Sequence, residues 1–398
     1  MVVIKTSIAQ IIARALNDAG ITIVTNVPGF GGTQVFDAFC EAHPASVLPS
    51  FHEEVAFSIA HGASLAGKRS ATLLKAHGFA KAANSVVDSL SVGTTAGFLV
   101  FVFDDAEGAH SDSILNSATL VSGTGIPYRR LKGQKPSQEI CDALAQSEEL
   151  QLPVVILVDS RDIQREGRYE PTETCTAPQS YCRDVVRHVL CPFLSCYHDE
   201  VLRAKISGHD WRGIEKPLLP NVPESLPDVW RRQAEVYKPF FEVFRTIRGD
   251  IVTGDTGISS LFAFPPYDCI DVCSYMGGSL PLAIGAYLAG YKDAWALTGD
   301  FSFIAAGHLG LLEAMQRDIP LRTVIFSNKK AEATGGQAIP GGMLEHILKG
   351  YEGAVVFIRN PWDEEELEAV LRQAKEAGDM RIVVVEYELA GGLKPRGD

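Results

Sequence analysis

The sequence predicts an α/β protein with two doubly wound parallel-sheet domains joined by an irregular linker. Short apolar or β-branched runs alternate with segments of helical periodicity near both ends of the chain. Between them, from Glu166 to Asp228, the periodicity fails and proline and charged residues dominate. We therefore expect a first domain over residues 1–165, a linker over 166–228 and a second domain over 229–398.

Each domain has its own series of expected elements. In the first, SIAQIIARALNDAG and HEEVAFSIAHGASLAG read as helices, and ITIVTNVPG, SATLLKAHG, AGFLVFVFDD and LPVVILVDS contain strands. The linker is expected to hold one or two helices around Asp184 to Lys205. The second domain is expected to end with the helix DEEELEAVLRQAKEAG and the strand RIVVVEY.

Composition narrows the class of protein. The chain has 398 residues, 46% of them hydrophobic, which is enough to bury large cores. No apolar run has the length of a membrane span and no signal-peptide core opens the chain, so we expect a cytoplasmic protein without membrane contact. A net charge of −13 without a Lys/Arg cluster argues against nucleic acid as a partner.

Four of the eight cysteines fall in one stretch. Cys175, Cys182, Cys191 and Cys196 are separated by six, eight and four residues, without a CxxC pair. This spacing favours buried free thiols over a metal or iron–sulfur cluster.

The most informative motif lies between two expected strands. Gly299-Asp300 follows the apolar run AWALT, and Asn328 follows the β-branched run LRTVIFS, with a helical segment between them. Parallel strands end at one edge of a sheet, where open α/β folds bind ligands, so Asp300 and Asn328 are expected to face one pocket. With the backbone carbonyl near Lys330 they form a set of hard oxygen donors suited to Mg²⁺ and a diphosphate-carrying cofactor.

Gly-Asp followed, after about 27 residues, by Asn resembles the thiamin diphosphate (ThDP) motif of the ThDP-dependent enzymes. The surrounding residues resemble most the α chain of indolepyruvate ferredoxin oxidoreductase and the phosphonopyruvate and sulfopyruvate decarboxylases. The resemblance implies that both domains have the ThDP-binding fold, with a pyrimidine-binding domain at 1–165 and a diphosphate-binding domain at 229–398. It also implies ThDP and Mg²⁺ as cofactors.

A second segment, GDTG followed by CSYMGGSLPLAIGAYLAG, resembles the part of the family that approaches the diphosphate at a helix start. Met276 stands where relatives place a bulky apolar residue under the cofactor, with core packing as the alternative. The glycine-rich loop NVPGFGGT is expected over the thiazolium, or to be a simple turn. The resemblance thus implies these cofactor-binding residues: Gly29, Gly254, Asp255, Thr256, Gly257, Met276, Gly277, Gly278, Gly299, Asp300, Phe301, Ser302 and Asn328.

A third segment, FHEEVAFSIAHGASLAGK, resembles the helix that carries the family's acidic residue, and Glu53 takes that position. Such a carboxylate bonds the aminopyrimidine nitrogen and thereby helps to form the thiazolium ylid. Glu54 is the alternative if the register is shifted by one, and a plain helix-dipole partner is the structural alternative. His77 and His110, in turns after expected strands, are the candidate proton donors and substrate ligands.

These features predict non-oxidative decarboxylation of a 2-oxo acid, or carboligation, through ylid and enamine intermediates. The chain shows no CxxCxxC segment of the oxidoreductase type, which disfavours a second reading as an oxidoreductase subunit with a separate electron-transfer partner. A non-catalytic scaffold subunit of the same fold is a third reading. The family resemblance implies a homodimer or homotetramer with shared active sites. The aromatic residues Phe30, Phe79, Phe301 and Phe303 suggest an apolar or aromatic 2-oxo acid.

Overall fold

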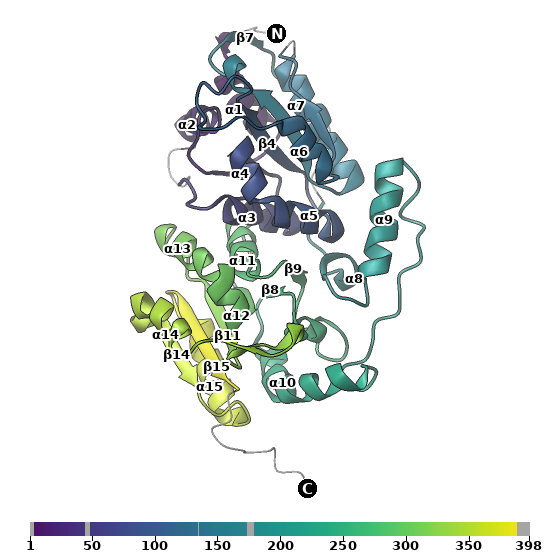
Figure 1. The fold of residues 1–398 in the computed structure, drawn as a ribbon, viewed down its shortest axis with the longest axis vertical. Helices are drawn as coiled ribbons and strands as arrows, with labels where there is room; N and C mark the ends of the chain where they lie inside the picture. Colours follow the sequence, from purple (N-terminus) through teal and green to yellow (C-terminus); the bar gives the residue numbers. More distant parts are fainter. Residues whose placement is uncertain (1–3, 44–47, 134, 173–178, 388–398) are drawn as a thin grey trace. The chain divides into compact units, whose positions relative to one another are not determined.

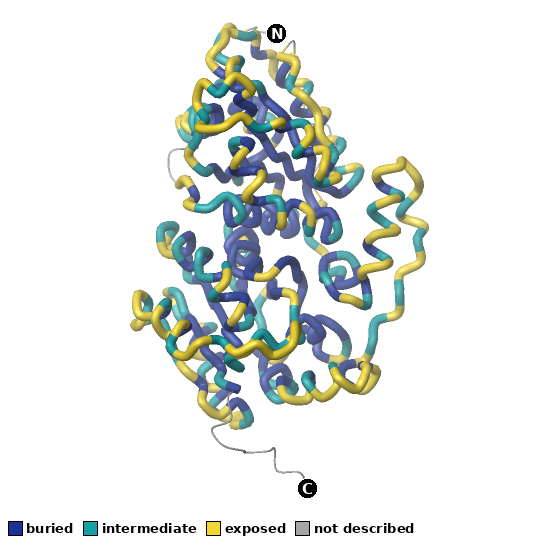
Figure 2. The backbone as a smooth tube through the Cα atoms, viewed as in Figure 1, coloured by how far each residue is buried: buried dark blue, intermediate teal, exposed yellow. Residues whose placement is uncertain are grey.

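Two parallel β-sheets organise the protein, as the sequence predicts (Figure 1). The structure, a computed structural model, describes residues 4–43, 48–133, 135–172 and 179–387. The chain divides into a first unit, Met1–Pro217 with Ile284–Lys292, and a second unit, Leu218–Ala283 with Asp293–Asp398. The inner strands of both sheets are largely buried, whereas the edge strand β5 is exposed (Figure 2).

The first unit contains a five-stranded sheet in the order β2-β3-β4-β6-β5, with every neighbouring pair parallel. Its strands are β2 (Ile23–Asn26), β3 (Ser70–Lys75), β4 (Phe98–Asp104), β5 (Tyr128–Arg130) and β6 (Val154–Asp159). Its helices are α1 (Ile8–Asp18), α2 (Gly32–Ala42), α3 (Glu53–Leu65), α4 (Ala76–Lys81), α5 (Ala83–Val92), α6 (Ser117–Gly123), α7 (Pro136–Leu150), α8 (Val185–His188) and α9 (Ser195–Ser207), with a 3₁₀ turn at Ser160–Asp162.

Alternating side chains of β4 pack into two hydrophobic cores, one on each face of the sheet. Leu99 and Phe101 pack into a cluster with residues of α1, α2 and α7. Phe98 and Val100 point to the opposite face and pack with residues of α3 and α5. Since successive side chains of a strand alternate between faces, a strand covered on both sides must be apolar throughout, as the run FLVFVF is.

The second unit contains a six-stranded parallel sheet in the order β14-β15-β11-β10-β8-β9. Its strands are β8 (Ile251–Asp255), β9 (Val272–Ser274), β10 (Ala294–Gly299), β11 (Arg322–Ser327), β14 (Val355–Ile358) and β15 (Arg381–Glu386), and β12 (Lys330–Ala331) pairs with β13 (Gln337–Ala338). The helices are α10 (Asp228–Ile247), the start of α11 (Ser279–Leu288), α12 (Asp300–Ser302), α13 (His308–Gln316), α14 (Met343–Leu348) and α15 (Glu364–Glu376), with a π turn at Phe303–Gly307 and 3₁₀ turns at Ile258–Ala263, Glu332–Thr334 and Lys349–Ala354. Helix α11 passes from the second unit into the first at Ile284.

Aromatic side chains from α10 fill the core of the second unit. Phe241 stacks on Phe262 with ring centroids 3.8 Å apart. Phe244 meets Trp295 of β10 edge to face at 5.3 Å. These rings bury a large apolar area and fix helix α10 against the sheet that carries Asp300 and Asn328.

The segment expected to be an irregular linker contains more structure than the sequence indicated. A strand, β7 (Glu166–Tyr169), pairs antiparallel with β1 (Ile4–Ser7). Farther along, buried side chains donate to backbone carbonyls at helix ends: His188 contacts the Val92 carbonyl at 2.9 Å and Lys205 donates to the Gln151 carbonyl at 3.3 Å. Such donors neutralise the negative ends of α5 and α7, so this segment is held by capping contacts.

Two expectations about composition can be compared with the structure. Among the described residues, no helix combines the length and the apolar character that crossing a bilayer needs. Cys191 is buried, as expected for a structural thiol, but Cys182 and Cys196 are exposed, so the expectation of burial is wrong for these two. Cys175 lies outside the described residues.

Candidate functional site

Asp300 and Asn328 follow neighbouring strands, as the motif predicts. Strands β10 and β11 are parallel, with Gly299 opposite Phe326 in the register. Asp300 comes directly after β10 and begins α12, while Asn328 follows the last residue of β11. Both side chains are therefore set at the carboxyl edge of the sheet, where a crossover leaves backbone groups unpaired.

The Asp300 carboxylate is buried and held by three donors. The side chain is only 3% exposed. One oxygen accepts from the backbone N–H of Phe301 at 2.8 Å, and the other accepts from the N–H of Lys329 at 2.7 Å and from the Ser327 hydroxyl at 3.3 Å. Burial raises the pKa of Asp300, and the hydrogen bonds oppose that shift because they favour the charged form.

Asn328 is fixed from both ends of its amide. Its nitrogen donates to the Tyr237 hydroxyl at 3.3 Å, and its oxygen accepts from the Lys330 backbone N–H at 3.1 Å. Lys329, between Asn328 and Lys330 in the sequence, has a φ of 57°, a left-handed conformation that is uncommon outside glycine. The backbone N–H of Lys329 in this turn donates to Asp300.

The donor set fits a hard divalent cation. In the described part of the chain, no three His, Cys, Asp or Glu side chains gather as metal ligands. What this edge offers is one carboxylate, one amide oxygen and the backbone near Lys330, all oxygen donors of the kind that Mg²⁺ binds together with phosphate oxygens. The Lys330 side chain is exposed and pairs with Glu332 at 3.7 Å, so only its backbone belongs to this set.

Two glycines precede α11 at positions where the surrounding atoms leave no space for a side chain. Gly277 has a φ of 87°, and a Cβ there would lie 2.7 Å from the Ala306 Cβ and 2.8 Å from the Gly307 nitrogen. A Cβ at Gly278 would lie 2.6 Å from the ring of Tyr275. The glycines thus have a packing reason to be present, besides leaving the helix N-terminus bare for an anion.

Asp255 organises this helix start from inside the protein. It is buried, accepts a 2.8 Å hydrogen bond from the Ser279 backbone N–H and also accepts from the Thr298 hydroxyl. Burial raises the pKa of Asp255 to about 6. Asp255 therefore joins the end of β8 to α11 and β10, and its carboxylate is buried.

The other residues expected near the cofactor differ in exposure. Met276 is 41% exposed and Phe301 is 43% exposed, which excludes core packing as the reason for Met276. Thr256 is exposed and Ser302 is buried. A Cβ added to Gly299 would meet nothing within 4 Å, whereas one at Gly254 would touch Ile270 at 3.2 Å.

A second set of site residues lies in the first unit, beginning with Glu53 at the first position of α3. Its side chain is 19% exposed and lies over Gly78, where a Cβ would come within 2.8 Å of the Glu53 Cγ. Oε2 is buried and accepts no hydrogen bond from any described residue, although the Lys81 Nζ lies 3.1 Å away. An acceptor atom in this state suits a ligand that brings an N–H donor.

The neighbouring carboxylate is already engaged. Glu54 accepts from the Asn84 side chain at 3.2 Å and from the Ser85 hydroxyl at 2.8 Å, both on α5. Of the two candidates for the acidic role, only Glu53 combines a buried oxygen with an unfilled hydrogen bond. The geometry thus favours the register in which Glu53 is the acidic residue.

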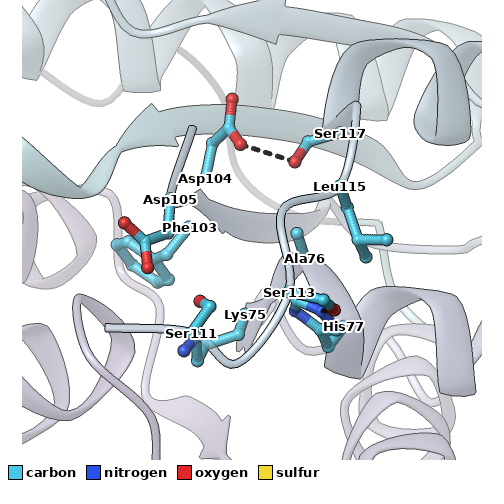
Figure 3. Close-up of a pocket in the computed structure, with 10 residues that line it drawn as sticks. All are labelled: Lys75, Ala76, His77, Phe103, Asp104, Asp105, Ser111, Ser113, Leu115 and Ser117. Atoms are coloured by element: carbon cyan, nitrogen blue, oxygen red, sulfur yellow. Dashed lines mark hydrogen bonds between the residues drawn. The ribbon is translucent and has the colours of Figure 1, made fainter. Parts of the chain in front are cut away.

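Of the two candidate histidines, His77 lines a narrow crevice at the carboxyl ends of β3 and β4 (Figure 3), and His110 is not among the lining residues. The His77 Nε2 lies 2.8 Å from the Ser113 hydroxyl. The ring of His110 stacks on Phe30 with centroids 3.6 Å apart, and its carbonyl accepts a hydrogen bond from Lys75. The crevice is lined by Lys75, Ala76, His77, Phe103, Asp104, Asp105, Ser111, Ser113, Leu115 and Ser117.

The glycine loop packs against the same lysine. A Cβ at Gly29 would lie 2.7 Å from the Lys75 Cγ, so glycine allows the loop to rest on the lysine stem. The Gly29 N–H donates to the Thr33 hydroxyl at 3.0 Å. Lys75 therefore links this loop to the segment that carries His110, a role that no sequence motif indicated.

Part of the second unit is similar to a known domain family. Residues 255–386 match the thiamine pyrophosphate enzyme C-terminal TPP binding domain. This stretch of the chain is therefore similar to the C-terminal domain of thiamine pyrophosphate enzymes. This domain contains Asp255, Met276, Asp300 and Asn328, and the match confirms the resemblance inferred from the sequence.

Relatives of this chain are known by name. It is 28% identical to the indolepyruvate oxidoreductase subunit IorA of Methanothermobacter marburgensis over 212 residues, which cover 48% of this chain and 34% of that protein. IorA of Archaeoglobus fulgidus is 33% identical over 103 residues, 24% of this chain and 16% of that protein. The matched region thus spans about a third, or less, of the length of these relatives.

A solved structure resembles nearly the whole chain. The thiamine diphosphate-dependent 4-hydroxybenzoylformate decarboxylase of Rhodococcus jostii RHA1 superimposes with a TM-score of 0.67 at 15% identity, covering 96% of this chain and 99% of that chain. At this identity the likeness establishes the fold alone. It confirms the predicted α/β class with parallel sheets of the ThDP-dependent type.

Proposed function

We propose that the protein is a ThDP- and Mg²⁺-dependent enzyme that acts on a 2-oxo acid, by non-oxidative decarboxylation or carboligation. The observation that carries this proposal is the pairing of Asp300 and Asn328 at the ends of adjacent strands within a TPP binding domain. Asp300, Asn328 and the backbone near Lys330 would hold Mg²⁺. The start of α11, with Gly277 and Gly278, would approach the diphosphate.

When bound, ThDP supplies a carbon nucleophile for the substrate carbonyl and an acceptor for the electron pair released with CO₂. The contribution of this chain is to bind, to orient and to move protons. Glu53 would accept a hydrogen bond at the buried Oε2, which no described residue uses, and would share that proton. His77, from the crevice at the ends of β3 and β4, and His110, stacked on Phe30, would hold protons near the substrate.

The proposed enzyme contains one pyrimidine-binding and one diphosphate-binding unit per chain. By its resemblance to the family, we infer that each active site takes Glu53 from one copy and Asp300 from another. The assembly would then be a homodimer or a homotetramer.

An oxidative reaction is the second candidate, favoured by relatives that are named indolepyruvate oxidoreductase subunits. In that case the electron pair would pass to an acceptor on a separate electron-transfer partner. The oxidative and the non-oxidative reactions both release CO₂ and differ in whether an electron acceptor is consumed. A scaffold subunit without chemistry is the third candidate, and it would be indifferent to ThDP and Mg²⁺.

The four phenylalanines that suggested an aromatic substrate differ in exposure. Phe79 and Phe303 are fully buried in their cores, so they offer no surface to a ligand. Phe30 and Phe301 are the aromatic residues from that set that remain accessible. The preference for an aromatic 2-oxo acid therefore loses half of its support.

A single experiment separates the three candidates. The purified chain, supplied with ThDP and Mg²⁺, is given a panel of aliphatic, aromatic and acidic 2-oxo acids, and CO₂ release is measured with and without an artificial electron acceptor. Release without an acceptor supports the decarboxylase, and release that requires one supports the oxidoreductase. No release with any substrate, together with no ThDP binding, would contradict the proposed function.

A further inference from the structure

Helix α4 is shaped around the Glu53 side chain. Gly78 provides the space in which Glu53 lies, because a Cβ there would come within 2.8 Å of the Glu53 Cγ and 3.3 Å of its Oε1. Lys81 follows Gly78 by three residues, so both lie on the same face of the helix. Gly78 thus leaves space for the Glu53 carboxylate, and Lys81, one turn later in the helix, contacts that carboxylate.

Lys81 and Glu53 form an ion pair in which the lysine is much more exposed than the carboxylate. Nζ lies 3.1 Å from Oε2, but the geometry does not form a hydrogen bond, and Oε2 remains without a donor among the described residues. The Lys81 side chain is 53% exposed, against 19% for Glu53. The ammonium group can therefore move into water at little cost, while the carboxylate stays in place.

We propose that Lys81 is the resident counter-ion of Glu53 and competes with the cofactor for its Oε2 atom. This inference rests on the proposed function, since it assumes that the pyrimidine ring nitrogen of ThDP donates to Oε2. In the cofactor-free chain, Lys81 reduces the cost of burying a carboxylate without a hydrogen bond. When the ring arrives, that interaction is exchanged for the new one, and cofactor affinity is lowered by the difference.

The size of the effect follows from the exposure of the lysine. Ion pairs of this kind contribute roughly 0.2–1 kcal/mol, which corresponds to about 1.5- to 5-fold in a binding constant. Lys81→Met is therefore expected to bind ThDP more tightly than the wild type by about that factor. Because salt screens an exposed charge, the ratio of the two affinities should approach one as ionic strength rises.

The test is a calorimetric titration of the full-length protein with ThDP at saturating Mg²⁺, at low and high salt. Lys81→Arg keeps the cation and should bind like the wild type. Lys68→Met is the matched control, because it changes the net charge of the protein by the same amount as Lys81→Met. Lys68 is exposed and forms no ion pair with the described residues. Tighter binding in Lys81→Met alone supports the proposal; equal or weaker binding, or the same shift in Lys68→Met, overturns it.

Inorganic diphosphate with Mg²⁺ separates this local effect from a general one. This ligand has no pyrimidine ring, so Lys81→Met should bind it as the wild type does, and a shift equal to that for ThDP would overturn the proposal. If the wild type does not bind ThDP at all, the proposed function fails. If ThDP binds and Lys81→Met leaves its affinity unchanged, only the role of Lys81 is wrong.

Discussion

The backbone N–H of Lys329 donates a 2.7 Å hydrogen bond to the carboxylate of Asp300. The bond joins the turn after β11 to the residue that follows β10, and the donor residue, Lys329, has a left-handed conformation. Backbone strain of this kind persists where the surrounding structure enforces it, and it is common at binding sites. The carboxylate of Asp300 is thus oriented before any ligand binds.

Replacing Asp300 should remove Mg²⁺-dependent cofactor binding. We expect Asp300→Ala to weaken ThDP affinity at saturating Mg²⁺ by more than about 100-fold, since losing even a residue that orients a metal ligand costs 10- to 100-fold. Titration calorimetry measures this loss. Asp318→Asn, an exposed position in the same unit, should bind normally. Unchanged affinity in Asp300→Ala would contradict the assignment.

Glu53 should matter for proton transfer more than for binding. Glu53→Gln is expected to keep ThDP affinity within a few-fold and to slow proton exchange at the thiazolium carbon by about 10²–10⁴-fold, the usual worth of general acid–base help. Exchange is followed by NMR in D₂O. Glu54→Gln is the control, because Glu54 bonds to Asn84 and Ser85. Slow exchange in Glu54→Gln, with fast exchange in Glu53→Gln, would mean that the register is wrong.

Two glycines at the candidate cofactor site should respond differently to alanine. Gly299 has a φ of −83° and space for a Cβ, so Gly299→Ala should fold as stably as the wild type while weakening ThDP binding, because the methyl group enters the open side of the site. Gly277→Ala has neither the allowed φ nor the space, and should destabilise the protein by more than about 1 kcal/mol. Thermal unfolding and ThDP titration of both variants check this contrast. Equal Tm losses would contradict it.

Asp255 should make stability depend on pH. Burial raises its pKa from 3.8 to about 6, so the folded chain holds the proton more tightly than the unfolded chain does. The resulting stabilisation is complete below about pH 4 and is lost as the pH rises through about 6, with a size of about 3 kcal/mol. In Asp255→Asn the amide can accept from Ser279 and donate to Thr298, whose hydroxyl can turn to the Gly299 carbonyl. The Tm of the wild type relative to Asp255→Asn should therefore fall between pH 4 and 6; parallel curves would exclude this titration.

If each active site takes residues from two copies, as proposed, two defective variants should complement each other. Mixing Asp300→Ala with Glu53→Gln chains should restore about one quarter of wild-type activity after random exchange in a dimer, because half of the dimers are mixed and each has one intact site. Purified mixed dimers should reach about one half. Activity is assayed by CO₂ release after subunit exchange has been verified by mass. A chain that stays monomeric at active concentrations would show that each copy builds its own site.

The sequence predicted the sheets and the placement of Asp300 and Asn328 at the ends of adjacent strands, because both depend on local patterns. Apolar runs marked β4, β10 and β11, and the Gly-Asp and Asn positions followed from where such runs end. It could not predict that Asp255 points inward or that Lys81 meets Glu53, because those contacts join residues far apart in the chain. Strand β7 was missed for the same reason: it is defined by its pairing with β1 and not by its composition.

The π turn at Phe303–Gly307 determines how helix α13 is rotated about its axis relative to the turn that contains Asp300. Helix α13 is seated on α11 at Gly310, where a Cβ would lie 2.6 Å from the Leu280 Cβ, so it cannot rotate freely. A π turn contains one residue more than an α-helical turn. Removing that residue would rotate the following helix by about 100° about its axis relative to the preceding turn. Deleting a single residue here would force either Phe301 or the Gly310 contact out of position. In this segment, insertions and deletions should therefore be tolerated far less than substitutions.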